Sequence, residues 1–365
     1  MGLSHQAILH AHPDVDLVAA CDRAGYVLDV IGKYTGVKTY SDYRKMLAEE
    51  DLDAVFIVTP SRYHGEMVRA ALEANLHVFC EKPFCLDASE GASLAQLAEM
   101  KSRVNQVGYH YRFIATFHEL KKLLDAGVLG DLHHIRAEAQ GPVVLRPKGG
   151  TWRSDKSEGG GCLYDYAIHA IDLVNYLVGR PESVSGSALH SLFSRDVEDE
   201  VYANIHYADG LIGHIAANWS DESQRKMSVK VSVWGKGGKI SADRQELQIY
   251  LREPSAVEHG LSKGWSMRYT TDLTDPTWFY LRGEEYSAQV DHFVQSIKNG
   301  QRDTRSTFRS AVDADLVAHA IQNDAIKAKT PTFAVAPASS PKPRRVPWLT
   351  RIGRHVLTNV QQQKG

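Results

Sequence analysis

Short apolar runs, each followed by a polar turn and a stretch of helical pattern, restrict the fold of the first 130 residues more than any other feature. The runs are Asp16–Cys21, Ala54–Thr59, His77–Cys80 and Val104–Gly108. Near-continuous apolar and β-branched residues, as in Ala54–Thr59, are typical of strands that are buried on both faces of a sheet. Helical patterns lie between the runs, at Tyr43–Glu50, Gly65–Ala74 and Ser89–Met100. This alternation predicts a parallel sheet with crossover helices, which is an α/β dinucleotide-binding type of domain.

The pattern changes after about Gly130, where segments of strand-like alternation take over. They are His133–Gln140, Tyr202–Tyr207, Leu211–Asn218, Ser228–Trp234 and Leu247–Leu251. Ala208-Asp209-Gly210 and Gly235–Gly238 lie between strands as hairpin turns, and helices are expected at Asp165–Val178 and Ser287–Asn299. We therefore predict a Rossmann-like domain over residues 1–112 and an α+β domain with a large, mostly antiparallel sheet over 113–330. Residues 331–365 form a basic linker and tail.

Composition excludes several classes of protein. The 365 residues, 43% of them hydrophobic, are enough for two cores. No apolar run approaches the ~18–20 residues of a membrane-spanning helix, and the first residues do not have the pattern of a secretory signal. Four cysteines, Cys21, Cys80, Cys85 and Cys162, are too few for a disulfide framework in a chain of this length. They fit buried thiols in a reducing cytoplasm, and their spacing does not suggest a metal site.

Charge is distributed unevenly along the chain. The net charge is −2, but residues 325–365 contain eight Lys or Arg and no Asp or Glu, so the first 324 residues carry −2 − 8 = −10. An acidic body argues against nucleic acid as a partner. Residues 336–345 read as a Pro/Ser linker, and basic residues alternate with apolar ones at helical spacing over 348–360. The tail is either frayed or a short amphipathic helix that docks on the body, a second subunit or an anionic membrane surface.

The beginning of the chain carries part of a dinucleotide-binding fingerprint. Gly2-x-x-His5 is followed by a helical pattern, a strand and then Asp22. The spacing from Gly2 to Asp22 matches that between the last fingerprint glycine and the acid that binds the adenosine ribose, although an ordinary turn glycine and strand-end Asp fit as well. We expect the chain as written to lack the first strand of the sheet, through a misassigned start or a truncated record. Roughly 8–15 upstream residues, a strand ending in Gly-x-Gly, are expected to restore NAD affinity and solubility.

Two polar turns follow apolar strands, at the edge where parallel sheets bind ligands. Thr59-Pro60 and His64 follow one strand, and Glu81-Lys82-Pro83 follows the next. Pro83 fixes its own φ and ends the strand, which places Lys82 at the carboxyl edge of the sheet. Solvated surface residues and a helix cap would explain these turns equally well.

A helix expected after the glycine run at residues 159–161 carries three ionisable residues on one face. Asp165, His169 and Asp172 stand at i, i+4 and i+7. His169 with Asp165 as its neighbour fits an acid/base pair. A metal site would need further ligands, and satisfied structural polar groups are the third interpretation.

Taken together, these motifs resemble the glucose-fructose oxidoreductase / inositol dehydrogenase (Gfo/Idh/MocA) family over residues 1–330. The resemblance implies that Lys82, Asp165 and His169 are catalytic. It also implies substrate contacts by Arg112, Trp152, Arg153, Asp165 and His169, and cofactor contacts by Gly2, Asp22, Thr59, Pro60, His64, Glu81 and Lys82. The chain departs from the family pattern at Ala167, where Gly is usual, and at His110, where Asn is usual.

The function that this resemblance implies is hydride transfer between a nicotinamide cofactor and a secondary alcohol of a sugar, polyol or nucleotide-sugar. His169 would take the hydroxyl proton, and Lys82 would hydrogen-bond the oxygen. Asp22 favours NAD, while Arg23 keeps NADP open. A homo-oligomer is expected through the outer face of the second domain's sheet, which we expect to present Val229, Val231, Val233 and Ile249. The alternatives are a catalytically silent binding or regulatory protein with the same fold and a metal-dependent lyase or hydrolase.

Overall fold

Five short parallel strands form the first part of the chain in the computed structural model, which describes residues 1–144, 151–255 and 260–327. They are β1 (Ala19–Cys21), β2 (Lys38–Tyr40), β3 (Ala54–Ile57), β4 (His77–Cys80) and β5 (Asn105–Val107). β1 pairs with β2, and β4 lies between β3 and β5. All three pairs are parallel, which confirms the α/β prediction.

These strands alternate with helices, which are α1 (Gly2–Ala11), α2 (Gly25–Thr35), α3 (Tyr43–Glu49), α4 (His64–Glu73) and α5 (Ala88–Met100). Local chemistry defines several ends. Asp42 and Asp87 accept hydrogen bonds from backbone N–H groups at the starts of α3 and α5, and Gly36 ends α2 in the left-handed conformation at φ 70°.

The two parallel sheets are separate among the described residues. β1 and β3 each pair on one side only, and the order is β1-β2 in one sheet and β3-β4-β5 in the other. Each strand therefore keeps one edge of backbone N–H and C=O groups without a strand partner. The expected strand ahead of Gly2 stays a prediction.

The second part of the chain is an eight-stranded sheet in the order β13-β12-β11-β10-β6-β9-β8-β7. The strands are β6 (Leu132–Gln140), β7 (Ser183–His190), β8 (Glu200–His206), β9 (Ile212–Asn218), β10 (Ser228–Gly235), β11 (Gly238–Ala242), β12 (Glu246–Leu251) and β13 (Gly264–Tyr269). Only the β6–β9 pair is parallel. The mostly antiparallel sheet is thus confirmed, and both predicted hairpin turns join antiparallel neighbours.

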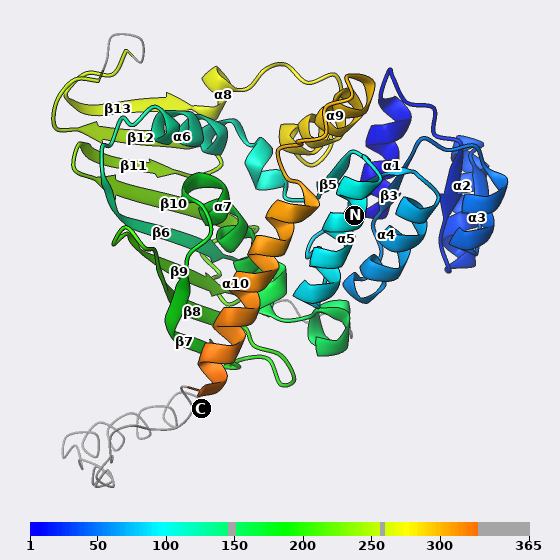
Figure 1. The fold of residues 1–365 in the computed structure, drawn as a ribbon, viewed down its shortest axis with the longest axis horizontal. Coiled ribbons are helices and arrows are strands. Elements are labelled where there is room, and N and C mark those ends of the chain that lie inside the picture. Colours follow the sequence, from blue (N-terminus) through cyan, green and yellow to red (C-terminus); the bar gives the residue numbers. More distant parts are fainter. Residues whose placement is uncertain (145–150, 256–259, 328–365) are drawn as a thin grey trace, which may run out of the picture. The chain divides into compact units, whose positions relative to one another are not determined.

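Helices cover one face of this sheet: α6 (Ala115–Asp125), α7 (Ile168–Val178) and α10 (Phe308–Lys327) (Figure 1). Val229, Val231, Val233 and Ile249 are fully buried in the core beneath them. The expectation that these residues form the outer face is therefore wrong, because strand alternation turns their positions inward. The open face carries the alternate positions instead, which are mostly polar and aromatic.

The two parts of the chain also pack against each other. α9 (Glu284–Lys298) contacts α1 and the 3₁₀ turn His110–Phe113, and α10 contacts α5. Met1–Ala328 forms one compact unit, so the predicted boundary at residue 112 stays a prediction. The predicted linker and tail, residues 331–365, lie outside the described residues. No helix in the described ranges has the length and apolar character needed to cross a membrane.

Candidate active site

Lys82 reaches across from the first part of the chain to the helix region of the second. It follows β4 in the turn Glu81-Lys82-Pro83, as predicted. Its Nζ donates to the backbone oxygen of Asp165 at 2.9 Å and lies 3.4 Å from Asp165 Oδ1. Two motifs that are 83 residues apart in the sequence therefore meet at one ammonium group.

Asp165 lies in a π-helical turn, Leu163–Ala167, that leads into α7. Such turns are rare and often occur at functional sites. Its carboxylate accepts from Arg153 Nε at 2.7 Å as well as facing Lys82, so two cations share it. Trp152 lies against the Arg153 guanidinium, with 4.8 Å from Cζ to the ring centroid. The predicted substrate contacts Trp152 and Arg153 thus lie beside the predicted catalytic pair.

His169 lies one helical turn beyond Asp165 and is 2% exposed. Its ring packs edge-on against the rings of His110 at 5.1 Å and Tyr111 at 5.2 Å. Burial lowers the pKa of His169 well below its ordinary value, and the positive charge of Lys82 lowers it further. The imidazole is therefore neutral at pH 7, which is the form that can accept a proton. Its Nδ1 is buried and has no hydrogen-bond partner among the described residues.

Asp172 belongs to a different cluster, although it continues the face predicted for Asp165 and His169. Its two oxygens accept from Arg112 Nε at 3.0 Å and from Arg112 Nη2 at 2.6 Å. Arg112 is 3% exposed and also donates to the backbone oxygen of Arg305 at 2.7 Å. The structure therefore keeps Arg112 and Asp172 together as a buried pair and does not place the Arg112 guanidinium with Lys82.

His64 and Glu81, both predicted to bind cofactor, are buried behind the turns rather than presented on them. Nδ1 of His64 lies 2.8 Å from the oxygen of Pro83, and Nε2 lies 3.0 Å from the oxygen of Thr59. Glu81 contacts Nε2 of His5 at 2.7 Å. These side chains join the two strand-end turns to the body of the fold.

The residues predicted for the adenosine end of a dinucleotide lie at the carboxyl end of β1. One oxygen of Asp22 accepts from the N–H of Ala24 at 2.8 Å, and the side chain is at the surface. The guanidinium of Arg23 lies 5.2 Å from the ring centroid of Tyr63. At the start of α1, a Cβ added to Gly2 would lie 3.6 Å from Val58, so this helix begins beside the end of β3. An exposed carboxylate for ribose hydroxyls, strand-end turns and Lys82 fit a nicotinamide dinucleotide along this edge.

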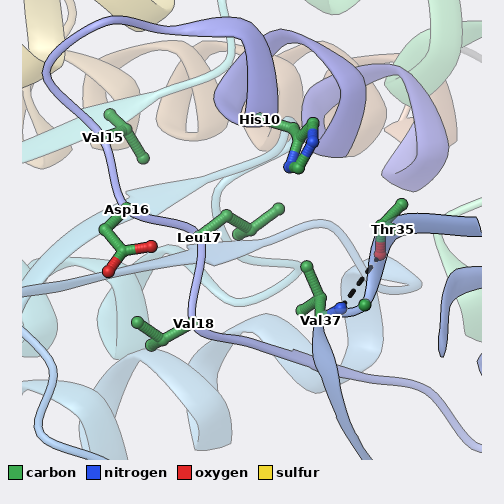
Figure 2. Close-up of a pocket in the computed structure, with 8 residues that line it drawn as sticks. His10, Val15, Asp16, Leu17, Val18, Thr35 and Val37 are labelled. Atoms are coloured by element: carbon green, nitrogen blue, oxygen red, sulfur yellow. Dashed lines mark hydrogen bonds between the residues drawn. The ribbon is translucent and has the colours of Figure 1, made fainter.

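Two hollows flank this region. One, of about 770 Å³, is lined by Pro60 and by residues of the segment 151–158, so it borders the cofactor edge on the side of Trp152. Figure 2 shows the other, of about 450 Å³, where Val15, Leu17 and Val18 precede β1. It lies at the amino end of β1, opposite Asp22, and contains none of the predicted site residues.

Sequence reasoning missed the aromatic wall beside His169. Tyr286, in the first turn of α9, stacks on His110 with ring centroids 4.7 Å apart and an angle of 18°. Burial lowers the pKa of His110 to about 3, so this second histidine is neutral as well. The departure from the family's usual Asn at position 110 was the available signal. Tyr286 gave none, because its position near His110 depends on the packing of α9.

No group of three or more His, Cys, Asp or Glu side chains within residues 1–144, 151–255 and 260–327 is arranged to hold a metal ion. On the helix face that was predicted to carry Asp165 and Asp172, the contacts of these two carboxylates explain why they are not arranged as metal ligands. Each carboxylate is engaged by arginine or lysine, and the two point to different partners.

Two sequence models of one family match this chain. Residues 1–109 match the oxidoreductase family with an NAD-binding Rossmann fold, Gfo/Idh/MocA, and residues 117–241 match a Gfo/Idh/MocA C-terminal domain. Among curated relatives, the D-glucoside 3-dehydrogenase of Escherichia coli is 26% identical over 63% of this chain and 70% of its own length. The scyllo-inositol 2-dehydrogenase (NAD(+)) of Bacillus subtilis is 26% identical over 82% of this chain and 86% of its own.

A solved structure shows the same fold. Levoglucosan dehydrogenase in complex with NADH and levoglucosan is similar with a TM-score of 0.78 and 24% identity, over 89% of this chain and 93% of that one. One family model matches residues 1–109 in the first part of the chain and the other matches residues 117–241 in the second, in agreement with the observed architecture. This chain therefore belongs to the Gfo/Idh/MocA family of NAD-binding oxidoreductases.

Proposed function

We propose that this protein is an NAD-dependent dehydrogenase that oxidises a secondary hydroxyl group of a sugar or polyol. The observation that carries the proposal is the meeting of Lys82, Asp165 and His169. An ammonium donor, its carboxylate partner and a neutral histidine lie together at the edge where a parallel sheet binds dinucleotides.

The chain's own residues divide the chemistry between them. Bound NAD would supply the hydride acceptor. His169 accepts the proton of the substrate hydroxyl, because its low pKa keeps the imidazole neutral. Lys82 donates a hydrogen bond to the same oxygen as it becomes a carbonyl oxygen. Asp165 orients Lys82 and Arg153, and Arg153 is the next donor available to a second substrate oxygen.

Relatives support the substrate class. The names of the glucoside, levoglucosan and inositol dehydrogenases all describe oxidation of cyclic polyhydroxy compounds. Trp152 beside Arg153 offers a flat apolar surface for one face of a sugar ring. The finer features that we propose are a preference for NAD over NADP through Asp22 and contacts with the substrate from Trp152 and Arg153.

A panel assay tests this function. The protein is mixed with NAD and with methyl glucoside, levoglucosan, myo-inositol, scyllo-inositol or a nucleotide-sugar, and the absorbance of NADH is followed. We expect turnover of at least one compound by the wild type. Turnover of none, while NAD still binds, would contradict the proposed function and favour the catalytically silent alternative.

We also propose that the protein is a homo-oligomer in the cytoplasm. The open face of the large sheet supports the first part, because it exposes Tyr202, Tyr250, Trp265, Met267 and Tyr269 by more than a third each. The four cysteines are free thiols, which supports a reducing compartment. A monomer in light scattering at micromolar concentration would contradict the oligomer.

A further inference from the structure

We infer that His5 is a positioning residue that holds the turn carrying Lys82 through Glu81, on the side of the turn opposite His64. This inference rests on the proposed role of Lys82. Sequence motifs contain both histidines, yet neither side chain is available to a cofactor: His5 is 1% exposed and His64 is 0% exposed. Their hydrogen bonds lead instead to the residues immediately before and after Lys82.

The first contact holds Glu81. Its Oε1 lies 2.7 Å from Nε2 of His5, and its Oε2 accepts from the backbone N–H of Lys82 at 3.2 Å. Burial raises the pKa of Glu81, but the hydrogen bond with His5 and the nearby charges, including that of Lys82, outweigh burial and bring the pKa to about 2. The carboxylate is therefore ionised at pH 7 and fixes the backbone at Lys82. A Cβ added at Gly108, just after β5, would lie 2.9 Å from the carboxyl group of Glu81. Glycine at position 108 therefore leaves room for this carboxylate.

The second contact holds Pro83. Nδ1 of His64 lies 2.8 Å from its carbonyl oxygen, and Nε2 lies 3.0 Å from that of Thr59. Both oxygens are acceptors, and burial lowers the pKa of His64, so the neutral ring donates to one of them at a time. Whichever of the two oxygens accepts, the imidazole fills the space between the turns after β3 and β4. The turn is thus held at residues 81 and 83, and the Lys82 side chain points to Asp165.

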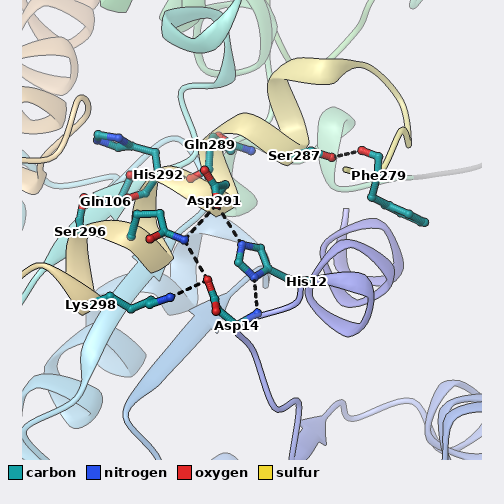
Figure 3. Close-up of polar contacts among 11 residues, drawn as sticks. His12, Asp14, Gln106, Phe279, Ser287, Gln289, Asp291, His292, Ser296 and Lys298 are labelled. Atoms are coloured by element: carbon teal, nitrogen blue, oxygen red, sulfur yellow. Dashed lines mark hydrogen bonds and ion pairs between the residues drawn. The ribbon is translucent and has the colours of Figure 1, made fainter. Parts of the chain in front are cut away.

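Helix α1 offers a matched control for His5. His12 lies seven residues later, at the C-terminal cap of the same helix, is 3% exposed, and contacts a carboxylate, with 3.2 Å between Nε2 and Asp291 Oδ1 (Figure 3). Nδ1 of His12 also accepts from the N–H of Asp14, at 3.1 Å (Figure 3). This cluster joins α1 to α9 and does not contact the Lys82 turn. A substitution at His12 therefore removes a contact between a buried histidine and a carboxylate but leaves the contact between His5 and Glu81 in place.

The experiment compares His5→Leu, His5→Gln and His12→Leu by two readouts. The first is the rate at which acetic anhydride labels Lys82, measured by mass spectrometry of peptides. We expect Lys82 to react slowly in the wild type, because Nζ is hydrogen-bonded to Asp165 and the side chain is 13% exposed. We expect labelling to rise about threefold or more in His5→Leu, since the turn opens locally, and to stay at the wild-type rate in His12→Leu.

The second readout is the split between kcat and KM with a sugar that the wild type oxidises. A displacement of about 1 Å can cost about 10²-fold in rate, so we expect kcat to fall 10- to 100-fold in His5→Leu with KM changed less than about threefold. His5→Gln keeps a donor for Glu81 and is expected to recover most of kcat. If His5→Leu does not fold, Glu81→Gln replaces it.

Equal losses of kcat in His5→Leu and His12→Leu with unchanged labelling of Lys82 would overturn the inference. Failure of the proposed function gives a different result, which is no turnover by the wild type. The labelling comparison then decides the positioning role by itself.

Discussion

Replacing Asp172 by Asn should destabilise the protein strongly while leaving the proposed chemistry in place. Asp172 and Arg112 are buried and share two hydrogen bonds, of 3.0 and 2.6 Å. Removing one partner of a buried ion pair costs about 3–5 kcal/mol, because the other charge remains buried without compensation. Arg112 keeps its hydrogen bonds to the backbone oxygen of Arg305 and to Ser310, but neither acceptor carries a negative charge that would compensate the guanidinium. A loss of this size is a large share of the ~5–15 kcal/mol that stabilises an ordinary domain.

Thermal unfolding followed by circular dichroism measures this loss. With an unfolding entropy of about 2.1 cal/mol/K per residue over roughly 330 residues, 3–5 kcal/mol lowers Tm by about 4–7 °C. Asp165→Asn is the matched control from the same helix region. Lys82 keeps its 2.9 Å bond to the backbone oxygen of residue 165 in that variant, so we expect a smaller change in Tm but a larger loss of activity.

A double variant that lacks both charges tests whether the loss of stability in Asp172→Asn comes from the unpaired charge of Arg112. Arg112→Met with Asp172→Leu removes both charges, and such replacements of buried pairs are often neutral or stabilising. We expect it to recover most of the Tm lost in Asp172→Asn. A Tm within 2 °C of wild type in Asp172→Asn, or activity lost as completely as in Asp165→Asn, would refute the division of roles between the two carboxylates.

Three further expectations concern charge at the site. The pKa of His169 is held well below 6.5, so kcat/KM should stay level from neutral pH down past 6.5 and fall only in more acidic buffer; a half-point at or above 6.5 would contradict burial as the cause. His110 has a pKa of about 3 in the folded state and about 6.5 when unfolded, so the unfolded state binds more protons between these values and stability is lost as pH falls through this window. Through His110, the free energy of unfolding at pH 5 should be about 2 kcal/mol lower than at pH 8. Urea unfolding of His110→Asn should no longer show this difference. Arg153→Leu leaves Asp165 with Lys82 alone, and we expect about a tenfold lower kcat/KM with NADH affinity unchanged in a fluorescence titration.

The sequence was informative where one physical rule dominates a segment. The apolar run at Ala54–Thr59 and the run His77–Cys80 predicted β3 and β4, because strands that are covered on both faces are apolar at most positions. Those runs also located Lys82, since the residue after a parallel strand lies at the ligand-binding edge. The Asp165–His169 pair followed from helical spacing in the same way.

The sequence did not predict elements in which the usual hydrophobic pattern is absent, reversed or interrupted. β2 is three residues long, Lys38–Tyr40, and has no apolar pattern. β13 exposes Trp265, Met267 and Tyr269 and turns its polar positions toward the covered side, which reverses the usual alternation. The apolar face of α10 includes a fully buried Asp315, which interrupts the pattern.

The division between Asp165 and Asp172 was also beyond the sequence. At i and i+7 the two carboxylates share one face of a regular α-helix. The π-helical turn at Leu163–Ala167 changes the number of residues per turn ahead of α7, so Asp165 turns to Lys82 and Asp172 to Arg112. Likewise, the resemblance assigned His64 to cofactor binding, and His5 was only part of the Gly2-x-x-His5 motif. Only packing reveals that both are buried.

The proposed function assigns the chemistry to Lys82 and His169 and the binding of the cofactor to the fold around them. Its most direct test measures NADH binding by fluorescence and NAD reduction by absorbance in wild type, Lys82→Ala and His169→Ala, with a sugar that the wild type oxidises. Loss of a general acid or base typically costs about 10²–10⁴ in rate. We expect a loss of kcat of this size in both variants, with NADH affinity within about threefold of wild type. Near-normal kcat in either variant would contradict it.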